Sequence, residues 1–213
     1  MNERRGRRSP SIGDRQRDPE RTRARILEAA SAEFAAHGYA GARVSAIASR
    51  AQVNQQLISY YFDGKQGLYR ALADQWRERE SDVVPTGTPL ADQVRRYALE
   101  ALHNSDGVRL LAWGGLEYDG PDTDPDHTAR NDRLTGSVTQ IRELQAAGRL
   151  PDALDPACFA VMLIAASMAT TTLPHVIEGL CHTDPRSDVF VHYWADQIAA
   201  LVEALTGTTP TSR

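Results

Sequence analysis

Two short helices separated by a tight turn are predicted between residues 44 and 62, and this segment constrains the fold most. The first helix, residues 44–50, carries apolar side chains at helical spacing. The second, residues 55–62, follows Asn54, a favourable N-cap because its side-chain oxygen can accept a backbone N–H. Ile58 and Phe62 stand four residues apart and point inward, so an unusually polar and aromatic face points outward. Two helices arranged in this way are the ingredients of a helix-turn-helix motif.

The outward face carries the chemistry that DNA recognition requires. A glutamine amide in the first turn of the second helix can pair bidentately with adenine N6 and N7. Serine and tyrosine hydroxyls can donate to phosphates. A lysine in the first turn of the following helix suits a phosphate oxygen, because free backbone N–H groups lie beside its ammonium. The candidate DNA contacts are Arg43, Ser45, Gln55, Gln56, Ser59, Tyr60, Tyr61 and Lys65.

A solvated helix face with incidental aromatic side chains is the alternative interpretation of this surface. The spacing and the caps agree with a single docking mode, which favours the DNA interpretation. Tyr61 is divided between two roles, because it sits between two inward positions and can face the core or the groove.

Start and stop signals mark the helices that flank this motif. Residues 18–20 (Asp-Pro-Glu) combine an N-cap acceptor, a proline at the first helical position and an acid in the first turn, and Gly38 supplies the stop. Residues 63–66 are interpreted as an acidic capping box that opens a fourth helix from Gly64 to about Arg79.

Beyond Pro85 and Pro89 the chain changes to longer and less basic helical stretches. The sequence shows no alternating strand pattern, so the fold class is predicted to be all-α. Breaks rich in Asp, Gly and Pro separate the expected helices at residues 90–104, 107–118, 128–147, 156–173, 174–182 and 187–206.

Charge is divided unevenly along the chain. Residues 1–80 carry 15 Lys and Arg against 10 Asp and Glu, a charge of +5, whereas residues 81–213 carry 9 against 18, a charge of −9. A basic end on an acidic body indicates a polyanion contact confined to that end. Residues 1–17 have no apolar periodicity and are expected to be disordered. By themselves their arginines favour a simple solvated tail.

Residues 21–68 resemble the DNA-binding domain of the TetR family of bacterial transcriptional regulators. The matching features are Ile26-Leu27-Glu28-Ala29-Ala30, Phe34, Gly38-Tyr39, Ile47-Ala48, Ala51, Val53, Tyr61-Phe62, and Lys65 before Leu68. The resemblance implies a homodimer that binds double-stranded DNA, with an all-helical C-terminal domain for dimerisation and ligand binding, and repression released by a small molecule. Residues 148–156, followed by an apolar helix, resemble that C-terminal domain weakly.

This chain departs from the family pattern at several positions. Arg43 stands where Ser or Thr often caps the second helix, which leaves its side chain available to phosphate. Gln52 replaces a turn glycine and requires an accommodating turn or a left-handed conformation at some cost. The recognition helix opens with Asn54-Gln55-Gln56, and Ser59 replaces a frequent tyrosine.

With the resemblance, the chain is divided into a basic tail (1–17), a helix-turn-helix domain (18–63) and a helical effector-binding and dimerisation domain (64–213). The expected dimer surface is the last two long helices, residues 156–173 and 187–206. The effector is expected to be small and largely apolar. Large or polarizable side chains on predicted helices are the candidate ligand contacts, although ordinary core packing is the alternative for each; they are Trp113, Tyr118, Met162, Met168, His175 and Trp194.

Two other classes of protein are alternatives to a ligand-responsive repressor. An enzyme is disfavoured because the chain has no phosphate loop, nucleophile elbow, HExxH or CxxC motif. A DNA-binding architectural protein without an effector remains the second alternative. No catalytic residue, cofactor or metal is expected, and Cys158 is expected to be buried packing.

Composition limits the cellular setting. Hydrophobic residues make up 41% and charged residues 24% of the chain, an ordinary globular balance. The longest apolar run, residues 158–169, is too short for a bilayer, and the basic N-terminus never reaches the apolar stretch of a secretory signal. Two cysteines exclude a disulfide framework. These features predict a cytoplasmic protein with no membrane contact.

Overall fold

The computed structural model describes residues 12–124 and 126–207, and this part of the chain is helical with no strand. It confirms the all-α prediction. The elements are α1 (Ile12–Gly41), α2 (Val44–Arg50), α3 (Gln55–Phe62), α4 (Gly64–Val83), α5 (Leu90–His103), α6 (Ser105–Leu116), the 3₁₀ turn η1 (Pro121–Thr123), α7 (His127–Ala146), α8 (Pro156–Thr172), α9 (Pro174–Cys181) and α10 (Asp188–Thr206). Beyond Pro89 the observed helices begin and end within two residues of the predicted bounds.

Helix α1 starts earlier than the sequence predicts. It begins at Ile12, and Pro19 lies inside it rather than at its first position. The prediction that Asp18 starts the helix is therefore wrong. A proline inside a helix removes one N–H donor and crowds the carbonyl four residues earlier, so Pro19 is a weak point of α1. Residues 1–11 of the predicted tail lie outside the described residues.

The predicted stop at Gly38 is confirmed as a break in α1. Gly38 has φ 71° and ψ 179°, a conformation outside the helical region that glycine adopts without steric cost. Helical turns continue to Gly41 after this break.

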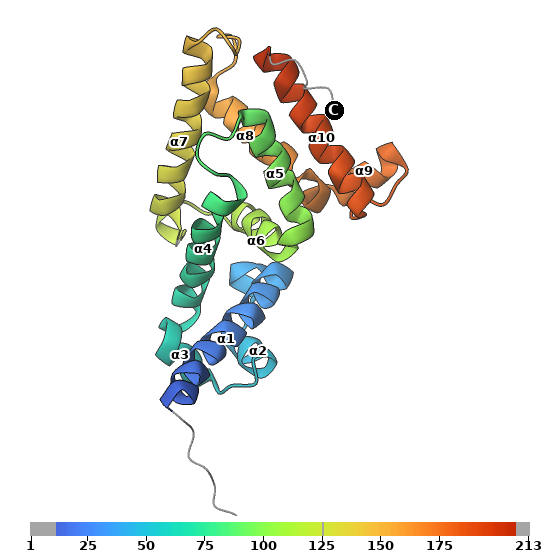
Figure 1. The fold of residues 1–213 in the computed structure, drawn as a ribbon. Helices are drawn as coiled ribbons and strands as arrows, with labels where there is room; N and C mark the ends of the chain where they lie inside the picture. Colours follow the sequence, from blue (N-terminus) through green and yellow to red (C-terminus); the bar gives the residue numbers. More distant parts are fainter. Residues whose placement is uncertain (1–11, 125, 208–213) are drawn as a thin grey trace, which may run out of the picture.

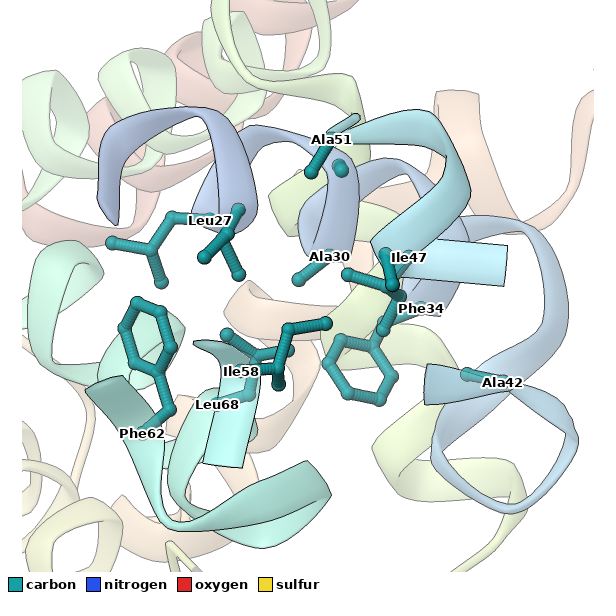
Figure 2. Close-up of a cluster of buried hydrophobic side chains, with 12 residues drawn as sticks. Leu27, Ala30, Phe34, Ala42, Ile47, Ala51, Ile58, Phe62 and Leu68 are labelled. Carbon is teal, nitrogen blue, oxygen red and sulfur yellow. The ribbon is translucent and has the colours of Figure 1, made fainter. Parts of the chain in front are cut away.

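Helices α1 to α4 enclose the first hydrophobic core. Ile26, Phe34, Ile47, Ile58 and Leu68 are completely buried and bring one apolar side chain or more from each helix to a common centre. Figure 2 shows Phe34, Ile47 and Ile58 pointing toward one another, with Leu68 of α4 beside Ile58. Helices as short as α2 and α3 are marginal in isolation, so this shared burial stabilises them.

A second core holds the C-terminal body together. Helix α5 packs against α8 and α10, and Val94, Ala98, Ala195 and Val202 are almost completely buried among them. In Figure 1, α5 and α10 lie toward the right of the body, α7 stands at the left with α8 next to it, and α4 lies below α7. Ion pairs tie α7 to α4: Arg133 Nε lies 3.3 Å from Glu80 Oε2, and Arg77 Nη1 donates to Asp126 Oδ1 at 2.5 Å.

The N-terminal helices meet the body where α6 packs on α1 (Figure 1). Arg109 Nε and Trp113 Nε1 of α6 both donate to the Ala35 carbonyl, each at 3.1 Å. Glu117, directly after α6, accepts the backbone N–H groups of Tyr39 at 2.8 Å and of Ala40 at 3.1 Å. The backbone around the Gly38 break is therefore capped by side chains from the body.

Within the described residues, no single helix is both long and apolar enough to cross a membrane. Helices α8 and α9 reach that threshold only as a pair, and they are bent by 82° where they meet.

Gly38→Ala is expected to destabilise the protein by about 1–3 kcal/mol, because alanine is strained at φ 71°. Its Cβ would also lie 2.2 Å from Glu117 Oε1 and 2.9 Å from the Trp113 ring. The matched control is Gly136→Ala on the exposed face of α7, where a Cβ meets nothing within 4 Å and a gain of about 0.5–1 kcal/mol is expected. Urea denaturation measures both, and equal stability of the two variants would contradict this account.

Candidate nucleic-acid interface

The turn between α2 and α3 is built by backbone hydrogen bonds and one side-chain cap. Gln52 adopts φ 53°, which confirms the left-handed conformation required by the missing glycine. The N–H groups of Val53 and Gln52 donate to Ala48 O and Ser49 O at 3.0 and 3.1 Å, the pattern of a Schellman motif. Asn54 Oδ1 then accepts the Leu57 N–H at 2.9 Å and starts α3 as predicted.

Helix α3 presents the polar face that its sequence predicts. Ile58 and Phe62 are buried, whereas Gln55, Gln56 and Ser59 are exposed. Tyr60 is 80% exposed, an unusual state for a large aromatic side chain. Tyr61 is half-buried: it packs against the first core, and its ring centroid lies 5.2 Å from that of Tyr60. Its sequence position left core and groove open, and the structure shows the core contact together with a partly exposed side chain.

The start of α2 is capped by a side chain of another helix. Arg43 occupies the N-cap position without a side-chain capping bond, and both Arg43 and Ser45 are exposed. The Arg43 N–H instead donates to Glu33 Oε1 of α1 at 3.2 Å. The sequence did not identify Glu33 as a cap. The structure shows it as a buried carboxylate on the apolar side of α1.

The junction of α3 and α4 corrects the predicted capping box. Asp63 has φ 57° and makes no side-chain capping bond to α4. Asp63 and Gly64, both left-handed, turn the chain sharply between the helices. Gly67 then lies so close to the end of α3 that a Cβ there would be 1.6 Å from the Phe62 carbonyl oxygen. Backbone packing, rather than a capping box, sets the angle between the two helices.

Lys65 projects from the first turn of α4 towards the end of α1. Its Nζ donates to the Ala40 carbonyl at 3.1 Å and lies 4.9 Å from the centroid of the Tyr39 ring. A second cation, Arg23 of α1, lies over the Phe62 ring at 5.1 Å. Cations therefore flank α3 from α1 and α4, and Arg43 adds another at the start of α2.

Helices α2, α3 and the N-terminal part of α1 lie at the end of the molecule that points away from α5, α8 and α10 (Figure 1). This end presents glutamine amides, hydroxyls and cations, and the acidic body is behind it. A short helix with polar side chains on its outer face, supported by a second helix across a tight turn, fits a DNA major groove. The fold and this surface define a helix-turn-helix DNA-binding protein.

The six candidate ligand contacts are dispersed. Trp113 binds α1, and Trp194 packs in the second core while its Nε1 donates to Ala166 O at 2.9 Å. Tyr118, Met162 and His175 are exposed, and Met168 is half-buried. A cleft of about 600 Å³ lies at the turn between α9 and α10, and none of the six lines it; its walls are Glu178, His182, Thr183, Asp184 and Pro185.

Other polar side chains carry no sign of a metal centre. Among residues 12–124 and 126–207, no three His, Cys, Asp or Glu side chains are grouped so that they could hold a metal ion. Cys158 is exposed near the start of α8, so the expected burial of this thiol is wrong. The apolar pattern of α8 did not reveal which side faces the core, because apolar residues surround this helix almost evenly.

Comparison with known proteins agrees with this architecture. Residues 26–72 match the family model of bacterial regulatory proteins of the tetR family, and residues 89–189 match a tetracyclin repressor-like C-terminal domain. The chain is 33% identical over 161 residues to the HTH-type transcriptional repressor SCO4008 of Streptomyces coelicolor, covering 75% of this chain and 83% of that one.

Solved structures share the fold over most of its length. The crystal structure of SCO4942 from Streptomyces coelicolor superposes with a TM-score of 0.70 at 25% identity, covering 88% of this chain and 99% of the other. AibR, crystallised with isovaleryl coenzyme A and operator DNA, superposes with a TM-score of 0.65 at 19% identity, covering 87% of this chain and 98% of the other. The chain belongs to the TetR family of bacterial transcriptional regulators.

Asn54→Ala is expected to destabilise the protein by about 1 kcal/mol, because the Leu57 N–H loses its acceptor at the start of α3. Asn54→Asp retains an acceptor oxygen and should preserve stability. Thermal unfolding of the two variants measures the difference. The cap has no energetic role if Asn54→Ala melts at the temperature of the unaltered protein.

Proposed function

We propose that this protein is a ligand-responsive repressor that binds a palindromic operator as a homodimer. The observation that carries the proposal is the exposed face of α3, with its glutamines in the first turn and Tyr60 almost fully in solvent. Gln55 and Gln56 are assigned to base edges, and Arg43, Ser45, Ser59, Tyr60, Tyr61 and Lys65 to the phosphate backbone.

The exposed apolar faces of α8 and α10 support a homodimer. Val161 and Met162 of α8 are 64% and 60% exposed, and Tyr193 and Leu201 of α10 are 58% and 60% exposed. Apolar surface shared by two adjacent long helices is typical of a protein interface. Two copies joined in this way would form a bundle of four helices and present two recognition helices to one duplex.

The size of the C-terminal body supports an effector. Helices α5, α7, α8 and α10 form a core of their own, separate from the core of the DNA-binding helices. AibR, a structural neighbour with the same fold, was crystallised with an acyl coenzyme A thioester as well as its operator. We place the effector of this protein among the helices of residues 90–182 and expect it to be largely apolar.

Selection from a random pool of duplexes tests the proposed function most directly. A palindromic sequence with half-sites about 34–36 Å apart is expected, since two recognition helices must enter successive major grooves. Gel filtration at micromolar concentration should give a dimer. A monomer that selects no duplex would contradict the proposal.

The dimer surface is tested by Leu201→Glu. A carboxylate in the apolar face of α10 should give a monomer and weaken operator binding on the order of a hundredfold, because avidity is lost. Thr135→Glu, on the exposed side of α7, is the matched control and should remain dimeric. A dimeric Leu201→Glu variant would place the interface elsewhere.

Base reading and phosphate binding should separate in two further variants. Gln56→Ala is expected to weaken binding to the selected operator by about 1–3 kcal/mol and to relax its sequence preference. Lys65→Ala should weaken all duplexes and reduce the salt slope by about one. Fluorescence anisotropy over a series of salt concentrations measures both. The assignment is inverted if Lys65→Ala alters sequence preference and Gln56→Ala does not.

An effector must bind more tightly to a conformation that is unsuited to the operator, since equal affinity for both conformations would shift nothing. Compounds found by thermal-shift screening can be titrated into the protein–operator complex. Affinity for DNA is expected to fall about 5–150-fold at saturation. Saturation without any change in DNA affinity would leave a DNA-binding protein that lacks effector control.

A further inference from the structure

Helix α6 presents three side chains to α1 along one stripe. Arg109, Trp113 and Glu117 follow at intervals of four residues, so they lie one above the other on the same face. All three bind backbone groups of residues 35–40 in α1, across 74 to 78 positions of sequence. The body is thus joined to the DNA-binding helices by hydrogen bonds to the main chain as well as by packing.

The break at Gly38 explains why these side chains are needed. An unbroken helix would pair the Tyr39 N–H with the Ala35 carbonyl. Here the Ala35 carbonyl accepts from Arg109 and Trp113, and the Tyr39 N–H donates to Glu117 Oε2. Partly buried backbone groups without partners are costly, so these three side chains stabilise the geometry at the end of α1.

Ala40 connects this cap to Lys65. Its N–H donates to both oxygens of Glu117, at 3.1 and 3.2 Å, and its carbonyl accepts from Lys65 Nζ at 3.1 Å. Lys65 also lies over the ring of Tyr39, whose N–H donates to the same carboxylate. Glu117 therefore holds both groups that orient the lysine. An ammonium has three donors, so the bond to Ala40 leaves two for a phosphate.

We propose that Glu117, a residue of the C-terminal body, positions Lys65 for the DNA backbone by fixing the Tyr39–Ala40 main chain. This inference rests on the proposed role of Lys65 as a phosphate contact. The Ala40 N–H and the Ala40 carbonyl belong to adjacent peptide units that share one Cα, so a carboxylate that fixes the N–H restrains the direction of the carbonyl that accepts from the lysine. Glu117 itself needs no contact with DNA.

A double-mutant cycle on operator binding tests the proposal. Glu117→Gln is nearly isosteric and keeps one acceptor, and circular dichroism melting checks its fold. It is expected to weaken operator binding about threefold to tenfold and to reduce the salt slope towards that of Lys65→Ala. The double variant should bind within about twofold of Lys65→Ala alone, because removing the lysine removes what Glu117 positions.

Two control variants separate positioning from general loosening. Glu143→Gln removes an exposed carboxylate of α7 and should bind DNA as the unaltered protein does. Trp113→Phe loses the bond to Ala35 but leaves the Ala40 contacts in place, so it should lower the melting temperature and keep the salt slope. Glu117→Asp is a second test variant, measured beside Glu117→Gln. It retains the charge, but its side chain is one methylene shorter.

The remaining outcomes overturn either this inference alone or the proposed phosphate contact of Lys65 as well. If Lys65→Ala weakens binding and the effects of Glu117→Gln and Lys65→Ala simply multiply, Glu117 acts independently of the lysine and only this inference is overturned. A salt slope unchanged in both Glu117 variants overturns it as well. If Lys65→Ala has no effect on any duplex, the proposed phosphate contact is wrong, and the positioning role of Glu117 is overturned with it.

Discussion

The structure depends on how the chain provides hydrogen-bond partners for the backbone N–H and C=O groups around Gly38, where α1 breaks. At this break the Ala35 carbonyl accepts from Arg109 and Trp113 of α6, and the N–H groups of Tyr39 and Ala40 donate to Glu117, directly after α6. One set of hydrogen bonds therefore both pairs main-chain groups at the end of α1 and joins α1 to the C-terminal body.

The recognition helix is held in a different way, by local backbone chemistry. Gln52 takes a left-handed turn, Asn54 caps the first turn of α3, and Gly67 lets α4 approach the end of α3 closely. Only Ile58 and Phe62 anchor α3 by full burial, which leaves the rest of this short helix for its outer face. Rigid support on one side and exposed amides on the other are what a DNA-reading helix of the TetR family requires.

Local signals in the sequence predicted much of this fold. Asn54 and the break at Gly38 were predictable because caps and glycine stops act within a few residues. Glu33 and Glu117 were not, because each binds backbone that lies 10 to 78 positions away, and a lone carboxylate carries no local pattern. The expected capping box at Asp63 failed because the tight approach of α4 to α3 imposes a left-handed backbone there. The effector candidates could not be judged from local sequence for the same reason. Trp113, one of them, makes a long-range hydrogen bond to the Ala35 carbonyl of α1.

The central claim is that Glu117 holds the main chain of Tyr39 and Ala40, at the end of α1, in the conformation seen with α6 packed against α1. Residue-resolved amide hydrogen exchange tests it without DNA or effector, by comparing the unaltered protein with Glu117→Gln. The Tyr39 and Ala40 amides should be protected in the unaltered protein and should exchange at least tenfold faster in the variant, while amides in the middle of α10 keep their rates. Equal protection of the Tyr39 and Ala40 amides in both proteins would contradict the claim.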